Sequence, residues 1–183
     1  MSKTGIFLSD GCEEIEALTV VDTLRRTGLE ITMISINNST SVTGSHGIPF
    51  IADTTFENVN FDEYDAIVLP GGMPGTIHLG EHEGVISIVK DFFAKGKLVC
   101  AICAAPSVLG AAGILQGRHA TCHPGFEEKL TGAITSTDPV VTDGNVITSR
   151  GMGTSIDFAL AIVRYLKDDA AVEELCQKLV YKK

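Results

Sequence analysis

The sequence is short of basic residues and has no long apolar run, and these two shortages exclude several classes of protein. Only 14 lysines and arginines stand against 23 aspartates and glutamates, which gives a formal net charge of -9. Such a chain has little to attract nucleic acid phosphates or an anionic membrane surface. No stretch approaches the roughly twenty apolar residues that a membrane-spanning helix needs. We therefore expect neither a nucleic acid nor a membrane as partner.

The sequence also lacks a linker, an internal repeat and a low-complexity segment. Its 19 glycines and 6 prolines are scattered between apolar segments, where they act as punctuation and do not divide the chain. A chain of 183 residues with 44% hydrophobic content has enough material for one buried core. We predict a single domain over residues 1–183.

A secretory leader and a disulfide framework are missing from the pattern as well. The first ten residues pass directly into a short strand-like segment, whereas a signal peptide has a longer apolar region and a cleavage site. The five cysteines are odd in number, and at least two lie in strongly apolar surroundings, so free thiols are the simpler interpretation. We expect a cytoplasmic protein.

What the sequence does contain is an alternation of short apolar strands and amphipathic helices. Periodicity, turn residues and glycine stops predict strands at 4–9, 30–36, 66–69 and 98–102, and a short strand at 119–122. They predict helices at 13–27, 83–95, 104–112 and 169–179, and a helix around 158–165. Hairpins are predicted at 41–53 and 140–148. This order favours an α/β fold with a mainly parallel sheet covered on both faces. In such sheets ligands bind beyond the carboxyl ends of the strands.

One of these strand ends carries a cysteine. Cys103 directly follows the apolar run 98–102 and precedes two alanines and a proline, which is the pattern of a nucleophile elbow. The next helix would direct its free N–H groups toward the sulfur and favour the thiolate. A buried cysteine that acts as a small hydrophobic residue is the alternative. Because Cys100 lies inside the apolar strand, a redox-active dithiol with Cys103 is disfavoured.

Glutamates and glycines at neighbouring strand ends are candidate partners of Cys103. Glu14 and Glu16 open the first predicted helix. One interpretation is that they only supply the negative charge that is favourable at a helix N-terminus. The other is that one of them is a protonated acid that hydrogen-bonds the sulfur. Helical-wheel geometry does not decide which glutamate that would be. Gly71 and Gly72 either present N–H groups to an oxyanion or form a plain turn.

His123 is a candidate general base, as cysteine nucleophiles often have, although a single loop histidine carries little weight. A zinc site built from Cys12, Cys122 and His123 lacks any paired ligand spacing. We expect no metal.

In combination these segments resemble the ThiJ/PfpI superfamily and, within it, the branch of the parkinsonism-associated protein deglycase, often called the DJ-one family. The resemblance covers nearly the whole chain. It is carried by Gly11-Cys12-Glu13-Glu14-Ile15-Glu16, Val68-Leu69-Pro70-Gly71-Gly72, Ala101-Ile102-Cys103-Ala104-Ala105-Pro106, His123-Pro124, Thr148-Ser149-Arg150-Gly151 and Gly153-Thr154-Ser155.

The resemblance implies a flavodoxin-like three-layer α/β/α sandwich that forms a homodimer and uses no metal or organic cofactor. It implies that Cys103 is the nucleophile, that Glu16 is its protonated carboxyl partner and that His123 lies nearby. The N–H groups of Gly72 and Ala104 would surround a bound oxyanion. Proteins of this kind are described as glutathione-independent glyoxalases, as protein deglycases, and as oxidative-stress responders whose cysteine becomes sulfinic acid.

This chain departs from the relatives at three points. Ala104 stands where PfpI-type hydrolases have histidine, which disfavours a protease. The elbow also lacks the glycines that flank the cysteine of related glutamine amidotransferases. His46 stands where relatives have an arginine, so sensitivity to peroxide is expected to differ. The leading hypothesis is an enzyme acting on small 2-oxoaldehydes such as methylglyoxal, and the alternative is a redox-sensing stress or chaperone-like protein.

Overall fold

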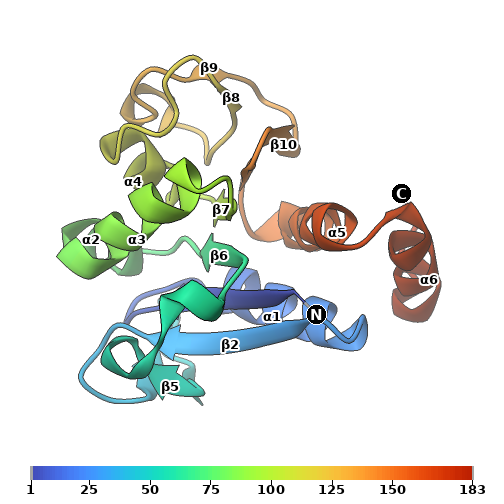
Figure 1. Cartoon of the computed structure of the whole chain (residues 1–183), viewed down its shortest axis with the longest axis horizontal. Coiled ribbons are helices and arrows are strands. Elements are labelled where there is room, and N and C mark those ends of the chain that lie inside the picture. Colours follow the sequence, from blue (N-terminus) through green and yellow to red (C-terminus); the bar gives the residue numbers. More distant parts are fainter. Residues whose placement is uncertain (1, 183) are drawn as a thin grey trace.

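The computed structural model describes residues 2–182 and shows helices on both faces of a central sheet, in the three-layer α/β/α arrangement (Figure 1). Seven strands form the sheet in the order β10-β11-β7-β6-β1-β2-β5. Neighbouring strands are parallel except β10, which runs antiparallel to β11. The strands are β1 (Lys3–Leu8), β2 (Glu30–Ser35), β5 (Thr54–Thr55), β6 (Ala66–Leu69), β7 (Leu98–Ile102), β10 (Val140–Asp143) and β11 (Val146–Ser149).

Two helical layers cover the sheet because successive side chains of each central strand point to opposite faces. In β1, Ile6 and Leu8 belong to one apolar core, whereas Phe7 belongs to the other. The first core is covered by α1 (Glu14–Arg26), α5 (Ser155–Leu166) and α6 (Asp169–Leu179), and the second by α2 (Gly75–Glu81), α3 (Glu83–Ala94) and α4 (Pro106–Ala111). Burial on both faces explains why β6 and β7 are continuous apolar runs.

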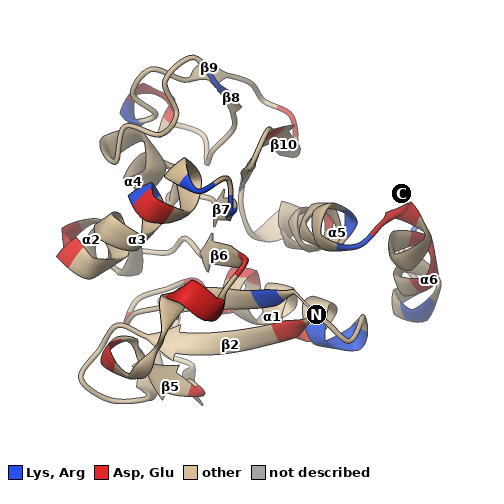
Figure 2. Ribbon diagram, in the orientation of Figure 1, with Lys and Arg blue, Asp and Glu red and all other residues tan. Residues whose placement is uncertain are grey.

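Short elements decorate this frame. A small hairpin pairs β3 (Ser41–Thr43) with β4 (Pro49–Ile51), and β8 (His119–Ala120) pairs with β9 (Ile134–Thr135). The 3-10 turns are Phe56–Asn58, Phe61–Glu63, Glu127–Lys129 and Met152–Thr154. Acidic and basic residues share the outer helix α6, where Lys178 pairs with Glu174 at 2.6 Å (Figure 2).

Most of the predicted elements are confirmed, and the exceptions have physical reasons. Strands 66–69 and 98–102 have the expected bounds, and both hairpins are present. The helix expected from residue 104 begins at Pro106, since a proline is well suited to the first helical position. Helix α2 was not predicted because two glycines, Gly75 and Gly80, weaken its helical signal. In residues 2–182 no helix has both the length and the apolar character to cross a membrane.

The direction in which strands are added to the sheet reverses near its centre. From β1 the chain adds β2 on one side, and then β6, β7 and β11 on the other. The order therefore reverses between β1 and β6, and their carboxyl ends border the crevice in which ligands of such sheets bind. The loops that follow β1, β6, β7 and β11 all reach this edge.

Candidate active site

Cys103 sits on a strained turn between β7 and α4. Its φ of 63° lies in the left-handed region, which costs a residue with a side chain about 1–3 kcal/mol. Its backbone N–H donates to Ser149 O at 3.0 Å, and its carbonyl accepts from His123 N at 2.8 Å. These two bonds hold the turn against neighbouring loops. The predicted elbow is confirmed, and the sulfur-bearing residue is only half-buried, so reagents can reach it.

Glu16 is delivered to the cysteine by the first turn of α1. The Glu13 carboxylate caps the helix by accepting from Glu16 N at 2.7 Å. The Glu16 side chain is buried, accepts from Gly71 N at 2.9 Å through Oε2, and hydrogen-bonds the Cys103 thiol. Helical geometry left two glutamates open, and the structure brings Glu16 to the sulfur as the family resemblance implies.

Two glycines after β6 allow this close packing. A Cβ on Gly71 would lie 2.6 Å from Cys103 Cβ and 2.7 Å from Glu16 Oε2, and a Cβ on Gly72 would lie 2.3 Å from Glu13 N. A side chain at Gly71 would push Cys103 and Glu16 apart, and one at Gly72 would collide with the backbone of residues 11–13. The N–H of Gly71 donates to Glu16 and is therefore not free to bind an oxyanion. The prediction of Gly71 as an oxyanion-binding residue is wrong. The N–H groups of Gly72 and Ala104 both donate to Cys103 Sγ.

The pKa values of Glu16 and Cys103 do not correspond to a thiolate that is ionised on its own at neutral pH. Burial raises the pKa of Glu16 to about 7. Burial, together with the negative charge of Glu16, raises the pKa of Cys103 to about 12, against the opposing effect of the Ala104 and Gly72 N–H groups. The Gly72 and Ala104 N–H groups favour the thiolate as expected, but burial and the negative charge of Glu16 outweigh their effect on the pKa of Cys103. Glu16 and Cys103 share protons and titrate as a pair.

This pairing still provides a route to a thiolate. Below about pH 7 both groups keep their protons. Above it the pair carries one negative charge, and the Glu16 carboxylate can accept the proton that its hydrogen-bonded thiol donates. The thiolate so formed keeps the two N–H bonds from Gly72 and Ala104. Glu16 is thus placed as a general base toward the sulfur.

The other four cysteines lack such a partner within the described chain, and all five are free thiols. Burial raises the pKa of Cys12 to about 12, of Cys122 to about 11, and of Cys100 well above its ordinary value. Cys176 is partly exposed on α6. Cys103 is distinguished from them by its neighbouring carboxyl group and paired N–H donors.

His123 and Gly151 border the space in front of the sulfur. The His123 ring is exposed, and its Nδ1 lies 3.0 Å from Pro124 O. A Cβ built on Gly151 would lie 3.7 Å from His123 Cδ2, 3.9 Å from Glu16 Oε1 and 4.0 Å from Cys103 Sγ. The three predicted catalytic side chains therefore face one small volume. Gly151 was not singled out from the sequence, where it was only one residue of a family motif.

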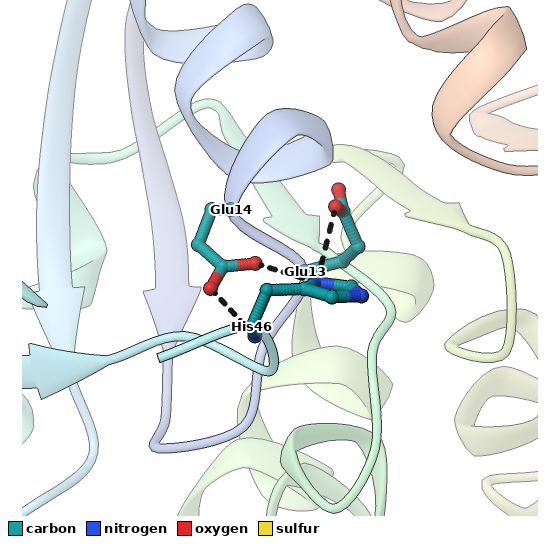
Figure 3. A group of neighbouring side chains, drawn as sticks. All are labelled: Glu13, Glu14 and His46. Carbon is teal, nitrogen blue, oxygen red and sulfur yellow. Dashed lines mark hydrogen bonds and ion pairs between the residues drawn. The ribbon is translucent and has the colours of Figure 1, made fainter. Parts of the chain in front are cut away.

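A second cluster, of Glu13, Glu14 and His46, lies at the N-terminus of α1 (Figure 3). Among residues 2–182, ligand atoms of three His, Cys, Asp or Glu side chains come within 4.8 Å of one another at Glu13, Glu14 and His46. His46 Nδ1 lies 3.2 Å from Glu14 Oε2 and 4.0 Å from Glu13 Oε1. The two carboxylates are already engaged with backbone N–H groups, so the cluster works as an anchor between α1 and the loop of residues 44–48.

Glu14 is the centre of this anchor. Its Oε1 accepts from His46 N at 2.8 Å and from Ile48 N at 3.4 Å, and Ser45 Oγ lies 3.4 Å from Oε2. Burial acts to raise the pKa of Glu14, but these hydrogen bonds outweigh it and lower the pKa to about 2. This role could not be predicted from the sequence, because the partners of Glu14 lie about thirty positions away and no local pattern points to them.

Comparisons with known proteins agree with this geometry. The sequence profile of the DJ-1/PfpI family matches residues 2–165. Protein dj-1beta of Drosophila melanogaster is 37% identical over 183 residues, covering 98% of each chain, and a deglycase of Pyrococcus abyssi is 36% identical over 165 residues, covering 88% of this chain and 98% of its own. The solved structure of oxidized DJ-1 from Toxoplasma gondii superimposes with a TM-score of 0.96 at 32% identity, with 100% of both chains covered.

The shared proton predicts how Cys103 reactivity depends on pH. The rate of Cys103 alkylation by iodoacetamide should rise as pH increases through about 7, because Glu16 becomes a base there. In Glu16→Gln this rise should disappear, leaving only an increase at alkaline pH. The rate is followed by mass spectrometry of the peptide containing Cys103, with Cys103→Ser as blank. A rise near pH 7 that persists in Glu16→Gln would contradict the assignment.

The Glu14 anchor predicts a pH-dependent stability loss. Glu14→Gln should lower the free energy of unfolding at neutral pH by about 2 kcal/mol, because hydrogen bonds to a charged acceptor are lost. The folded pKa of about 2 lies below the ordinary 4.5, so this stabilisation is full above about pH 4.5 and is lost as pH falls toward 2.

Urea unfolding at several pH values measures this difference, with the exposed Glu128→Gln as the charge-matched control. A deficit that is the same at pH 7 and pH 3, or that the control shares, would contradict the anchor.

Proposed function

The chain belongs to the DJ-1/PfpI family, and from that membership and the geometry around Cys103 we propose that it is a glutathione-independent glyoxalase or deglycase-type enzyme acting on 2-oxoaldehydes. The observation that carries the proposal is the half-buried Cys103 thiol hydrogen-bonded to a buried carboxyl group whose pKa is about 7. A relative from Pyrococcus abyssi bears the name deglycase, which supports this class of chemistry.

The first step forms a bond between sulfur and carbon. Glu16 takes the thiol proton, and Cys103 Sγ attacks the aldehyde carbon of methylglyoxal to give a hemithioacetal. The N–H groups of Gly72 and Ala104, which donate to Sγ, would then stabilise the charge that develops on the oxygen of the attached carbon. The proton held by Glu16 then neutralises that oxygen.

The second stage moves hydrogen between two carbons and needs no external oxidant or reductant. The Glu16 carboxylate removes the proton from carbon 1 and returns it to carbon 2, while the hydroxyl proton on carbon 1 passes to the oxygen of carbon 2. Carbon 1 is thereby oxidised to a thioester and carbon 2 is reduced to an alcohol. Water, oriented with the help of His123, cleaves the thioester and releases the hydroxy acid and the Cys103 thiol. A carboxyl group with a pKa near 7 is well matched to taking up and returning protons.

The proposal extends to adducts of 2-oxoaldehydes with amines and thiols, and to a role under carbonyl or oxidative stress. The half-exposed sulfur is consistent with attack on a carbon carried by a larger molecule. We place the activity in the cytoplasm, where free thiols such as the five in this chain are maintained.

Two substitutions test the reaction. Cys103→Ser should reduce conversion of methylglyoxal to lactate to background, and Glu16→Gln should lower kcat by about a hundredfold or more, because it removes the proton acceptor. Cys176→Ser, at the other partly exposed cysteine, should retain wild-type activity. Lactate is measured enzymatically over time. Wild-type turnover in Cys103→Ser would rule out the proposal.

A second candidate function is redox sensing through the same sulfur. The solved relative from Toxoplasma gondii is described as oxidized, and the N–H groups around Cys103 suit the oxygens of a sulfinate. Two equivalents of peroxide would oxidise the thiolate first to sulfenic and then to sulfinic acid, releasing water at each step. Intact-mass measurement after mild peroxide treatment separates the two: stable addition of two oxygens at Cys103, with negligible aldehyde turnover beforehand, favours the sensor.

We further propose that the chain is a homodimer. Large apolar side chains on α1, α5 and the β3-β4 hairpin are exposed, among them Ile15 at 50% and Ile48 at 53%. With Leu18 and Ile156 they line one shallow groove, and a two-fold contact through this face would bury the same patch on both subunits. Sedimentation velocity should give a dimer for the wild type and a monomer for Leu18→Glu. A monomeric wild type at micromolar concentration would refute this.

A further inference from the structure

Gly151 is the residue of the site whose missing side chain has no structural explanation. Gly71 and Gly72 must be glycine, because a Cβ there would collide with atoms between 2.3 and 2.7 Å away. A Cβ on Gly151 would meet nothing nearer than 3.7 Å, which is an ordinary contact distance. Its φ of 162° and ψ of -170° describe extended backbone that any residue adopts. Neither packing nor conformation therefore requires glycine at this position.

What a side chain at residue 151 would occupy is the reaction space itself. The three atoms nearest to its Cβ position are His123 Cδ2, Glu16 Oε1 and Cys103 Sγ, at 3.7, 3.9 and 4.0 Å. A methyl group there would stand almost equally far from all three predicted catalytic side chains. The same volume must hold the atoms that a bound aldehyde carries next to the carbon attacked by Cys103.

The backbone around Gly151 is fixed, so this volume has a firm wall. Thr154 Oγ1 accepts from Gly151 N at 3.1 Å and donates to Gly151 O at 2.9 Å, and Thr154 N donates to the same carbonyl at 2.8 Å. The Thr154 hydroxyl also lies 2.7 Å from Ser149 Oγ at the end of β11. Because these four hydrogen bonds hold the backbone at Gly151, it cannot easily shift to make room for a larger substrate.

We infer that Gly151 is the size-determining residue of the site: the space above its α-carbon receives the substituent on carbon 2 of a 2-oxoaldehyde bonded to Cys103. This inference rests on the proposed function and narrows its substrate class. Glyoxal carries only hydrogen at carbon 2 and does not need the space, whereas methylglyoxal carries a methyl group that fills it. Substrates with bulkier groups meet the wall.

Gly151→Ala tests the inference with Gly153→Ala as the matched control. Gly153 lies two residues away in the same turn, and a Cβ there would have no neighbour within 4 Å. In Gly151→Ala, kcat/KM for methylglyoxal should fall about tenfold or more relative to that for glyoxal, because a site wall that takes the space of one methyl group discriminates by at least that factor. In Gly153→Ala the ratio should stay within about twofold of wild type.

A second measurement does not depend on the proposed reaction. Iodoacetamide and its N-benzyl derivative share one reactive group but differ in size, and mass spectrometry of the Cys103 peptide gives the alkylation rate for each. Gly151→Ala should slow the benzyl reagent about tenfold more than iodoacetamide, while Gly153→Ala leaves the rate ratio unchanged. Equal unfolding midpoints for wild type and both variants would show that the fold is retained.

The two measurements separate two kinds of failure. If wild type converts neither aldehyde but Gly151→Ala still discriminates between the alkylating reagents, the proposed function fails and the size-determining role stands. If the reagent ratio in Gly151→Ala equals that of wild type, the inference about Gly151 is overturned, whatever the aldehyde activity.

Discussion

The hydrogen bond between the Glu16 carboxyl group and the Cys103 thiol is the interaction on which the rest of the site depends. Burying an acid beside a thiol disfavours two negative charges there, so the pair holds one charge near neutrality and moves a proton between oxygen and sulfur. Burial raises the pKa of Glu16 to about 7, and this makes the carboxyl group a usable base at physiological pH. The reactivity of Cys103 follows from its partner more than from the sulfur itself.

The surrounding structure can be understood as support for this one contact. The strained φ of 63° at Cys103 turns the sulfur out of β7, and the Glu13 cap fixes the first turn of α1 so that Glu16 reaches it. Gly71 has no Cβ, and this leaves room for the Glu16 and Cys103 side chains to meet. On the far side of the same helix turn, Glu14 ties down the loop of residues 44–48. The strained turn persists because the hydrogen bonds of Cys103 with Ser149 and His123 hold it in place.

Much of this could be predicted from the sequence because it depends on local patterns. Apolar runs ending in glycine or cysteine predicted β6, β7 and the crevice at their carboxyl ends, and the elbow at Cys103 followed from residue order alone. The glutamate that meets the sulfur was not decided by helical periodicity, since Glu14 and Glu16 are both buried. The resemblance to known relatives pointed to Glu16, and the structure places the Glu16 carboxyl group in a hydrogen bond with the Cys103 thiol.

Other features were out of reach because they depend on contacts between distant segments. The role of Glu14 requires the loop of residues 44–48 to return to α1, and the raised pKa of Cys103 requires burial of its thiol beside Glu16. The N–H groups at the turn favour an ionised sulfur, whereas burial and the negative charge of Glu16 act in the opposite direction. The space above the α-carbon of Gly151 can be recognised only in the folded chain, where Glu16, Cys103 and His123 come together around it.

The shared titration of Glu16 and Cys103 is tested most directly by carbon-13 NMR, following the Glu16 side-chain carboxyl and the Cys103 β-carbon in the native protein as pH is varied. The account predicts that the Glu16 signal titrates near pH 7 and that the Cys103 signal responds at the same pH. A Glu16 carboxyl that titrates near its ordinary value of 4.5, with no change at Cys103, would contradict it.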